Sequence, residues 1–294
     1  MATVANKIDR DGLGLYKEIF NAVGVPATTP DALRTYLLAG SKLDFAAAPR
    51  DKQRSVVIDP LAQVEIIDSL KGLFQSSSEI ADQYKNGNMG MAAGFKWSMD
   101  QNVVSHVVGA QGGTPLVDGA AQSGSSLVTD GWTASAAERL KQGDIFTIAG
   151  VFAVNPQSRQ STGQLQQFVV TAAASSDGSG DATLAISPSI VTSGAFQTVA
   201  SAPADNAAIT VLGAGGAISP TNMAYHKDAF ALACADLMLP KGVDMAARIS
   251  DKQLGMSVRM IRDYDINTDK MPCRLDVLYG WKAIYPELAC RIQG

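Results

Sequence analysis

The chain has 294 residues, of which 46% are hydrophobic and only 18% charged. This length is enough for two ordinary domains, each with a hydrophobic core. The formal net charge of −4 provides no basic field to attract phosphates, so nucleic acid is not an expected partner. The sequence has no run approaching the roughly 20 apolar residues of a membrane helix, and its start lacks the apolar core of a signal peptide. We therefore expect a folded protein that is made in a cytoplasm and stays there, without a membrane partner.

The N-terminal part of the chain predicts two helices. Apolar residues recur at helical spacing through residues 1–23, which predicts a surface helix closed by Gly24 and Pro26. Residues 29–31 (Thr-Pro-Asp) are typical of an N-cap and first turn, so a second helix should follow and end near Gly40.

A strand and a third helix are predicted next. Residues 55–58 (Ser-Val-Val-Ile) form a short apolar run typical of a strand. The following Asp59-Pro60 pair should open a helix. That helix carries Leu61, Val64, Ile67 and Leu70.

The predicted secondary structure changes after residue 108, where helical patterns end and short runs rich in β-forming residues begin. Strands are predicted at residues 144–154, 164–171, 182–186 and 207–212. Turns are predicted at the dipeptides Asp130-Gly131, Asn155-Pro156, Asp177-Gly178 and Gly215-Gly216. This spacing favours a small antiparallel barrel or sandwich that is inserted in the chain, because mixed α/β character returns after residue 219.

The C-terminal part predicts strands at residues 224–236, 256–264, 274–281 and 288–292. In the strand at 256–264, Met256, Val258 and Met260 alternate with polar residues, which indicates that one face of this strand is exposed to solvent. Residues 265–269 (Asp-Ile-Asn-Thr-Asp) open like a calcium loop, but Lys270 stands where the sharp turn needs glycine. We therefore interpret them as an acidic turn of a hairpin.

Few residues could carry catalysis or bind a metal. The three cysteines, Cys234, Cys273 and Cys290, form no CxxC pair, and their odd number predicts free buried thiols in a reducing compartment. With only His106 and His226, a three-histidine metal site is impossible. His226 fits a polar cluster at a strand end better than a proton-transfer site. The sequence assembles no nucleophile, base and orienting acid, so we predict no enzyme, no catalytic residue and no cofactor.

Two glycine- or serine-rich segments are also weighed as sites. Residues 212–216 (Leu-Gly-Ala-Gly-Gly) superficially resemble a phosphate loop, but Pro220 follows where a helix should begin. Residues 122–126 (Gln-Ser-Gly-Ser-Ser) lack the strand-to-helix setting of a hydrolase nucleophile. Both are interpreted as loops.

Six runs of the sequence are distinctive: NKIDRDGL at 6–13, APR at 48–50, MDQN at 99–102, AYHKDAF at 224–230, PCRLDVLYGW at 272–281 and YPELA at 285–289. They resemble the coat-protein family of P-twenty-two-type phages. The resemblance extends over essentially the whole chain. It implies a structural major capsid protein of a tailed bacteriophage, a component of the virion that is assembled in the bacterial host cytoplasm.

The resemblance also implies a fold and a set of partners. The fold is α+β, the Hong Kong 97-like capsid fold, with a spine helix, a peripheral sheet and a central-axis lobe. Residues 1–108 and 220–294 would form this capsid core, and residues 109–219 an inserted antiparallel β-barrel. The implied partners are other copies of the chain in hexamers and pentamers, together with scaffolding and portal proteins.

Family members carry an N-terminal arm and an extended loop ahead of the spine helix, whereas this sequence starts at that helix. A truncated chain, a start chosen at an internal methionine and a shortened prophage gene all remain open. If these parts are missing, we expect a folded monomer or small oligomer that does not close into shells alone. Arms that cross to neighbours add contact area to every subunit at once.

One loop of the predicted β-domain is a candidate contact between subunits. It is polar and carries Asn155, Gln157, Arg159 and Gln160. The alternative is a solvated hairpin tip.

A second function also stays open, that of a phage surface or tail module binding a receptor or glycan through the β-domain. It would need an aromatic-lined groove, but Trp132, Phe146, Phe152, Phe168 and Phe196 fall largely inside strand patterns and look like core.

Overall fold

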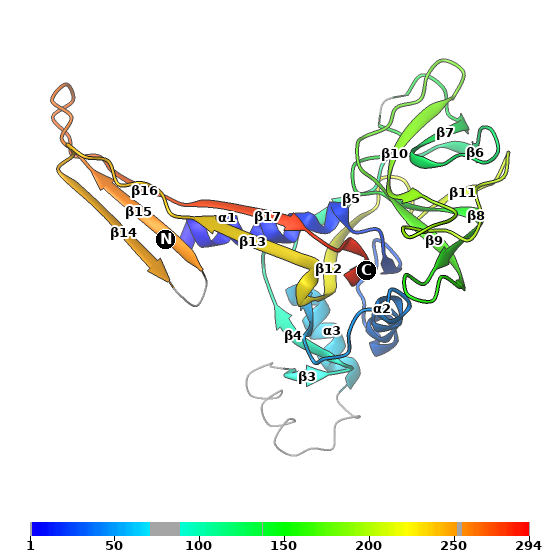
Figure 1. Cartoon of the computed structure of the whole chain (residues 1–294), viewed down its shortest axis with the longest axis horizontal. Helices are drawn as coiled ribbons and strands as arrows, with labels where there is room; N and C mark the ends of the chain where they lie inside the picture. The colour runs from blue at the N-terminus through cyan, green and yellow to red at the C-terminus, as the bar shows by residue number, and fades with distance from the viewer. Residues whose placement is uncertain (1, 71–88, 137, 252–254, 294) are drawn as a thin grey trace.

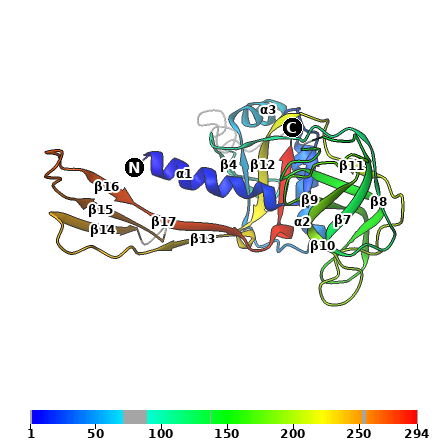
Figure 2. The ribbon, with the colours of Figure 1, turned by 90° about the horizontal axis from the view of Figure 1, so that it is seen from above.

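The computed structural model describes residues 2–70, 89–136, 138–251 and 255–293. It consists of a central body, a β-barrel on one side of the body and a long thin arm on the other (Figure 1). The arm comprises residues 230–251 and 255–283. Seen from above, the body and barrel form a compact mass from which the arm projects beside the N-terminal helix (Figure 2). Helices and strands do not alternate regularly, so the predicted α+β class is confirmed.

The body is built on a seven-stranded mixed sheet in the order β1-β18-β12-β2-β4-β3, with β5 paired to β12. Its strands are β1 (Ala22–Gly24), β2 (Arg54–Ile58), β3 (Met91–Ala92), β4 (Phe95–Met99), β5 (Ser105–Val107), β12 (Ile218–His226) and β18 (Ala289–Gln293). β1 pairs in parallel with β18, although the two strands lie near opposite ends of the chain. The body therefore cannot close until the two ends meet, which makes its contacts strongly non-local.

Helices α2 (Leu33–Phe45) and α3 (Pro60–Leu70) share one hydrophobic core with this sheet. α3 begins where Asp59-Pro60 predicted it, and the Asp59 carboxylate accepts hydrogen bonds from the backbone N–H groups of residues 61 and 62. Its buried side chains are Ala62 and Ile66, whereas Leu61 and Val64 are exposed. The side chain of Leu70 lies outside the described part of the structure.

The predicted bounds of α2 were wrong at both ends. The helix begins at Leu33 rather than at residues 29–31, because the Tyr36 hydroxyl donates a hydrogen bond to the Pro30 carbonyl oxygen and Ala32 is extended. It also continues past Gly40, since burial of Leu43 on the sheet outweighs the modest helix penalty of one glycine.

The first helix is shorter than predicted. α1 ends at Leu13 and is followed by a 3-10 helix, η1 (Gly14–Glu18), and by strand β1. The tighter turn of η1 buries Tyr16, and Gly24 is a strand residue rather than a helix cap. Strand pairing with β18 therefore takes residues 22–24 out of the predicted helix. Met1, which the prediction included, lies outside the described residues.

The barrel is a six-stranded sheet in the order β11-β8-β9-β10-β7-β6. Its strands are β6 (Gly113–Val117), β7 (Gly124–Trp132), β8 (Ile145–Val154), β9 (Ser161–Val170), β10 (Ala182–Ile190) and β11 (Ile209–Val211). A bridge between Leu116 and Ala208 joins the first strand to the segment before the last, so the sheet is nearly closed. Its interior holds a core of its own, including Leu127, Phe146 and Phe168. The four strands predicted in this span are present, and β6 and β7 were missed.

The predicted turn at Asp130-Gly131 was wrong, because both residues belong to β7. Gly131 has φ +72°, and a Cβ there would lie 2.4 Å from the carbonyl oxygen of Thr114 on the neighbouring strand. The pairing of β6 with β7 shifts register beside it. The glycine therefore marks a bulge inside a strand rather than a reversal of the chain.

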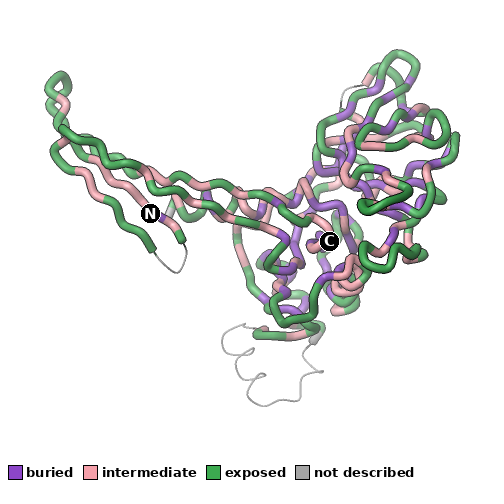
Figure 3. Tube along the Cα trace, in the orientation of Figure 1, coloured by how far each residue is buried: buried purple, intermediate pink, exposed green. Residues whose placement is uncertain are grey.

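The arm consists of a two-stranded and a three-stranded antiparallel sheet. Its strands are β13 (Phe230–Ala235), β14 (Met245–Asp251), β15 (Met256–Arg262), β16 (Cys273–Asp276) and β17 (Leu278–Ala283). β14 was not predicted, whereas β15 and β16 form the predicted hairpin around the acidic turn. The arm is exposed or half-buried along most of its length (Figure 3). On β15 the buried residue is Ser257, so the predicted apolar face is only half covered.

The prediction of buried thiols holds for one cysteine. All three cysteines are free, but only Cys290 in the body is buried, while Cys234 is half-buried and Cys273 is exposed. The two outer cysteines lie on the arm, where too little of the chain packs together to cover them.

Candidate subunit-contact site and the joints between segments

The candidate contact loop joins β8 to β9 at the rim of the barrel. The Asn155 carboxamide oxygen accepts hydrogen bonds from the backbone N–H groups of Gln157 and Ser158, which closes a tight turn. The Asn155 side-chain nitrogen donates to the Phe45 carbonyl oxygen at the end of α2, at 2.9 Å. Asn155 therefore anchors the loop to the body. Gln157, Arg159 and Gln160 are exposed, and Arg159 has φ +58°.

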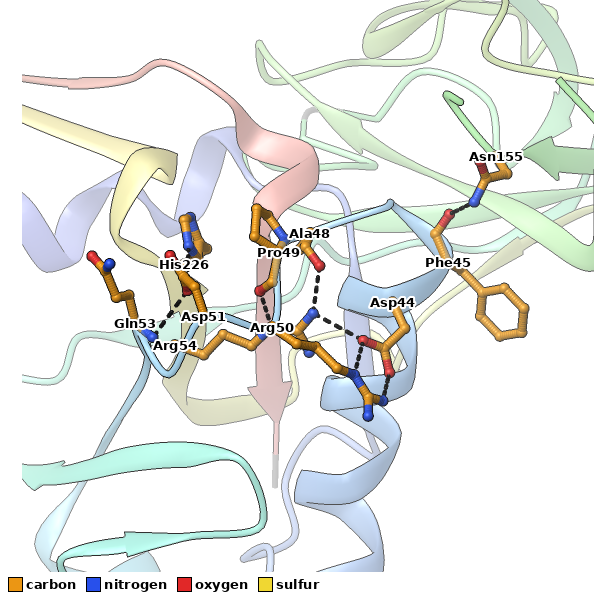
Figure 4. A network of polar contacts seen from close by, with 10 residues as sticks. All are labelled: Asp44, Phe45, Ala48, Pro49, Arg50, Asp51, Gln53, Arg54, Asn155 and His226. Atoms are coloured by element: carbon orange, nitrogen blue, oxygen red, sulfur yellow. Dashed lines mark hydrogen bonds and ion pairs between the residues drawn. The ribbon is translucent and has the colours of Figure 1, made fainter. Parts of the chain in front are cut away.

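A network of polar contacts extends from this anchor into the body (Figure 4). Arg54, which is 5% exposed, donates to the carbonyl oxygens of Ala48 and Pro49 and forms an ion pair with Asp44 at 2.9 Å. Arg50 also binds Asp44, and these bonds hold the pKa of the Asp44 carboxyl below its ordinary value. The guanidinium groups thus fix the turn between α2 and β2.

His226 lies at the end of β12, in the predicted strand-end cluster. Its ring is buried, with Nε2 3.1 Å from the Asp51 carboxylate and Nδ1 accepting a hydrogen bond from the backbone N–H of Asp228. Desolvation raises the pKa of Asp51, but hydrogen bonds from the Gln53 backbone N–H and from His226 outweigh it and hold that pKa below its ordinary value. His226 of the run at 224–230 therefore binds the segment that directly follows the run at 48–50 (Figure 4).

A second buried network joins the barrel to the body. Asp144, just before β8, accepts hydrogen bonds from the backbone N–H groups of Gly109 and Lys141 at 3.0 and 2.7 Å. Its other carboxylate oxygen lies 2.7 Å from His106 Nε2, and Tyr16 lies 3.2 Å from the opposite ring nitrogen. Asp144 and His106 are both buried. The chain of contacts from η1 through β5 to the barrel holds the two parts in one orientation.

Arg291 completes this junction. It is fully buried, and its guanidinium donates to the carbonyl oxygens of Ile19 and Gly143, both at 2.6 Å. Burial lowers the pKa of Arg291 to about 9. The sequence prediction did not single out this residue. A signal exists, because Arg291 interrupts the otherwise apolar run at residues 288–292, and strands buried on both faces have no wet side for such a residue.

The remaining family-like runs meet where α1 lies along the arm. Trp281 donates a hydrogen bond to the Ile8 carbonyl oxygen at 2.9 Å, and Tyr279 donates to Asp11 at 2.7 Å. A Cβ on Gly12 would lie 2.9 Å from the Trp281 ring, so glycine allows the close approach. Asn102 donates to the side chains of residues 6 and 9. These bonds fix α1 to the arm and to the segment after β4.

The acidic turn of the arm is closed by its own hydrogen bonds. Asp265 accepts from the Asn267 backbone N–H and from the Thr268 hydroxyl, and Asp265 pairs with Lys270 across the turn. Within residues 2–70, 89–136, 138–251 and 255–293, no three histidine, cysteine or acidic side chains gather as a metal site would require.

The histidines sit in structural positions. Both carry hydrogen-bonded partners on each ring nitrogen, and both rings are buried away from solvent. Such groups can hold a fold together, but a substrate cannot reach them without local opening.

Two of the five aromatic residues predicted as barrel core are exposed. Trp132, Phe146 and Phe168 are buried, whereas Phe152 is 38% exposed and Phe196 is 84% exposed. Phe196 lies in the loop after β10, where no strand alternation directs it inward. In the described ranges, no helix has the length and apolar character needed to cross a membrane.

Comparison with known proteins identifies the family. The family model described as P22 coat protein, gene protein 5, matches residues 23–294. Among solved structures, the chain matches the CUS-3 coat protein I-domain with 29% identity over 35% of this chain and 98% of that chain, at a TM-score of 0.26. No curated protein matches the sequence. The family match spans the barrel and arm and nearly all of the body, so the chain belongs to the P22 coat protein family and is a structural major capsid protein.

Proposed function

We propose that the chain has the Hong Kong 97-like capsid architecture and assembles through pentamers and hexamers into the icosahedral shell of a tailed bacteriophage. In this proposal α1 is the spine helix and the arm supplies the peripheral sheet. Residues 1–108 and 220–294 form the capsid core, and residues 109–219 form an inserted domain. The antiparallel pairing of β5 with β12 supports these boundaries, because the chain leaves the body after one strand and returns in the other.

The observation that carries the proposal is the arm. A three-stranded sheet gains stability from a covered hydrophobic face, yet large apolar side chains of the arm are open to solvent. Met238 is 85% exposed, Ile249 76% and Ile266 82%. β14 is an edge strand of this sheet, so its backbone offers a further pairing surface. A subunit that neighbouring copies complete would bury such surfaces.

The exposed part of the candidate contact loop fits the same role. With Asn155 tied to Phe45, the exposed residues Gln157, Arg159 and Gln160 belong to a fixed turn. A preorganised polar loop loses little conformational freedom when it binds. We assign it to contacts between capsomers. Scaffolding and portal proteins are the further partners in this proposal, and assembly takes place in the host cytoplasm.

Electron microscopy of the protein expressed from its full reading frame tests the proposal. Closed polyhedral particles are expected from the unmodified protein. Ile249→Glu should lower the particle yield at least about tenfold, because an interface that loses about 1.4 kcal/mol weakens by that factor. Val128→Glu, an exposed apolar position on the barrel, is the matched control and should keep the yield.

The contact loop is tested in the same particles. Arg159→Glu should reduce the yield of particles. Ser125→Glu is the control, because it places a carboxylate at an exposed position of β7, away from the contact loop, and it should not reduce the yield. Thermal unfolding of each variant before assembly separates loss of contact from loss of folding. Normal particles from Ile249→Glu would remove the arm from the lattice contacts, and failure of the unmodified protein to form particles would contradict the shell role.

A further inference from the structure

A cavity of about 320 Å³ lies between the barrel and the body. The body contributes Phe20, Lys42 and Phe45 to its wall, and the barrel contributes Leu165, Pro188 and Phe196. This volume is at the lower end of the range for small-molecule sites. The cavity lies beside the turn that Asn155 ties to the body, and of its lining residues the shell proposal assigns only Arg159 to a contact between subunits.

The wall of the cavity is mainly apolar and only partly covered. Phe45 from the body is 39% exposed, and Phe196 from the barrel is 84% exposed. Leu165 on β9 is 37% exposed beside them. An apolar chain entering the cavity would remove this surface from water and gain about 25 cal/mol for each Å² buried.

Charge inside the cavity is positive. Lys42 is half-buried in its wall, and no described residue is within ion-pair distance of the Lys42 ammonium. Desolvation lowers the pKa of Lys42. Arg159 and Glu287 also line the cavity, so its charged groups sum to one positive charge. An unpaired ammonium in an apolar wall is favoured by an anionic partner with hydrogen-bond acceptors.

We propose that this cavity binds a carboxylate carried on an aliphatic chain. The aliphatic chain lies between the rings of Phe45 and Phe196, and the carboxylate lies at Lys42. Two sources have this chemistry, a free fatty acid and the C-terminal carboxylate of a peptide that ends in an aliphatic residue. Either ligand would touch both the barrel and the body and would therefore stabilise their relative orientation.

Calorimetric titration of the unassembled full chain tests the site. Octanoate should bind saturably with one site per chain. Acetate should not, because it lacks the aliphatic chain, and octylamine should not, because its head group is a cation rather than a carboxylate. A short N-acetylated peptide ending in leucine distinguishes the sources. Tighter binding of the peptide than of octanoate assigns the site to a chain end, and the reverse order assigns it to a free acid.

Variants locate the ligand. Lys42→Met should weaken octanoate binding at least about tenfold, because it removes the hydrogen bond between the ammonium and the carboxylate. Lys42→Arg should retain binding, and Lys241→Met, at an exposed lysine of the arm, is the control. Circular dichroism of each variant shows whether it is folded. Equal binding of octanoate and octylamine, unchanged binding in a folded Lys42→Met variant, or no saturable binding of either carboxylate would overturn the proposal. None of these readouts depends on assembly.

Discussion

Replacement of Asp144 should separate the stability of the barrel from that of the body. The Asp144 carboxylate is 1% exposed and has contacts with His106 Nε2 and with the backbone N–H groups of Gly109 and Lys141. Asp144→Ala leaves these three donors without their acceptor. Each unpaired buried group costs about 1–3 kcal/mol, so the variant should lose roughly 3–9 kcal/mol of unfolding free energy, toward the lower end because the Lys141 donor is only partly buried.

Asp144→Asn should be milder, and it should move a proton on His106. In the unmodified protein His106 Nε2 lies 2.7 Å from the carboxylate, which can only accept, so we assign the proton to Nε2 and let Nδ1 accept from the Tyr16 hydroxyl. An asparagine would turn its oxygen to the two backbone N–H groups and its NH₂ group to His106. Nε2 must then accept, so the proton moves to Nδ1 and is donated to the Tyr16 oxygen. The loss should be smaller than for Asp144→Ala, because three charge-assisted bonds become neutral but none of the donors is left without a partner.

The three tryptophans provide local probes for this experiment. Trp97 lies in the body, Trp132 in the barrel and Trp281 on the arm. Urea unfolding of single-tryptophan variants should show coincident transitions in the unmodified protein and separate transitions for body and barrel in Asp144→Ala. The barrel should survive longer, since its core is contained within its own sheet.

A control variant and the position of the His106 proton test the role of Asp144. Asp205→Ala removes a carboxylate that accepts one backbone hydrogen bond on the exposed barrel surface, and it should change stability by less than about 1 kcal/mol. Nitrogen chemical shifts report the His106 tautomer. Coincident transitions in Asp144→Ala at unchanged stability, or an unmoved proton in Asp144→Asn, would refute the role of Asp144 as the junction acceptor.

Two further predictions concern the body. Gly24→Ala should destabilise the protein by at least about 2 kcal/mol more than Gly94→Ala. Both glycines have positive φ, but a Cβ on Gly24 would lie 2.0 Å from the Gln293 carbonyl oxygen, and a Cβ on Gly94 would meet nothing within 4 Å; urea unfolding compares the variants. Acid should destabilise the protein below the ordinary Asp44 pKa of 3.8. Bonds from Arg50 lower that pKa in the folded state, so the unfolded state takes up protons first and stability falls with pH. Asp44→Asn should show a shallower fall over about pH 4 to 2, and equal slopes would contradict this assignment.

The sequence predicted the elements whose pattern is local. The four barrel strands detected have clear alternation or apolar runs, and α3 has its Asp59-Pro60 start. β6 and β7 were missed because their residues are small and polar and because Gly131 forms a bulge that resembles a turn. Glycine dipeptides identify positions of unusual backbone conformation, but they do not distinguish a bulge from a reversal.

Helix ends and exposed aromatics could not be predicted, since distant residues determine them. The start of α2 depends on a hydrogen bond from the Tyr36 hydroxyl, and the end of α1 precedes a strand that pairs with the last residues of the chain. Phe196 was expected in the core because the residues around it resemble a strand pattern, yet it belongs to a loop that places it at the cavity wall. In each case tertiary contacts override the local preference.

The runs that resemble the coat-protein family are the places where separate segments of the chain are joined. Residues 6–13 bind residues 99–102 and 272–281, and His226 of the run 224–230 binds Asp51, which follows the run 48–50. A capsid subunit must hold its arm, body and barrel in fixed relation, because the curvature of a shell depends on the angles between its parts as well as on the contact surfaces. Hydrogen bonds in these joints are directional, so they specify those angles in a way that apolar packing alone does not. The features that identify the family are therefore geometric ones, and we expect substitutions there to change particle shape before they abolish folding.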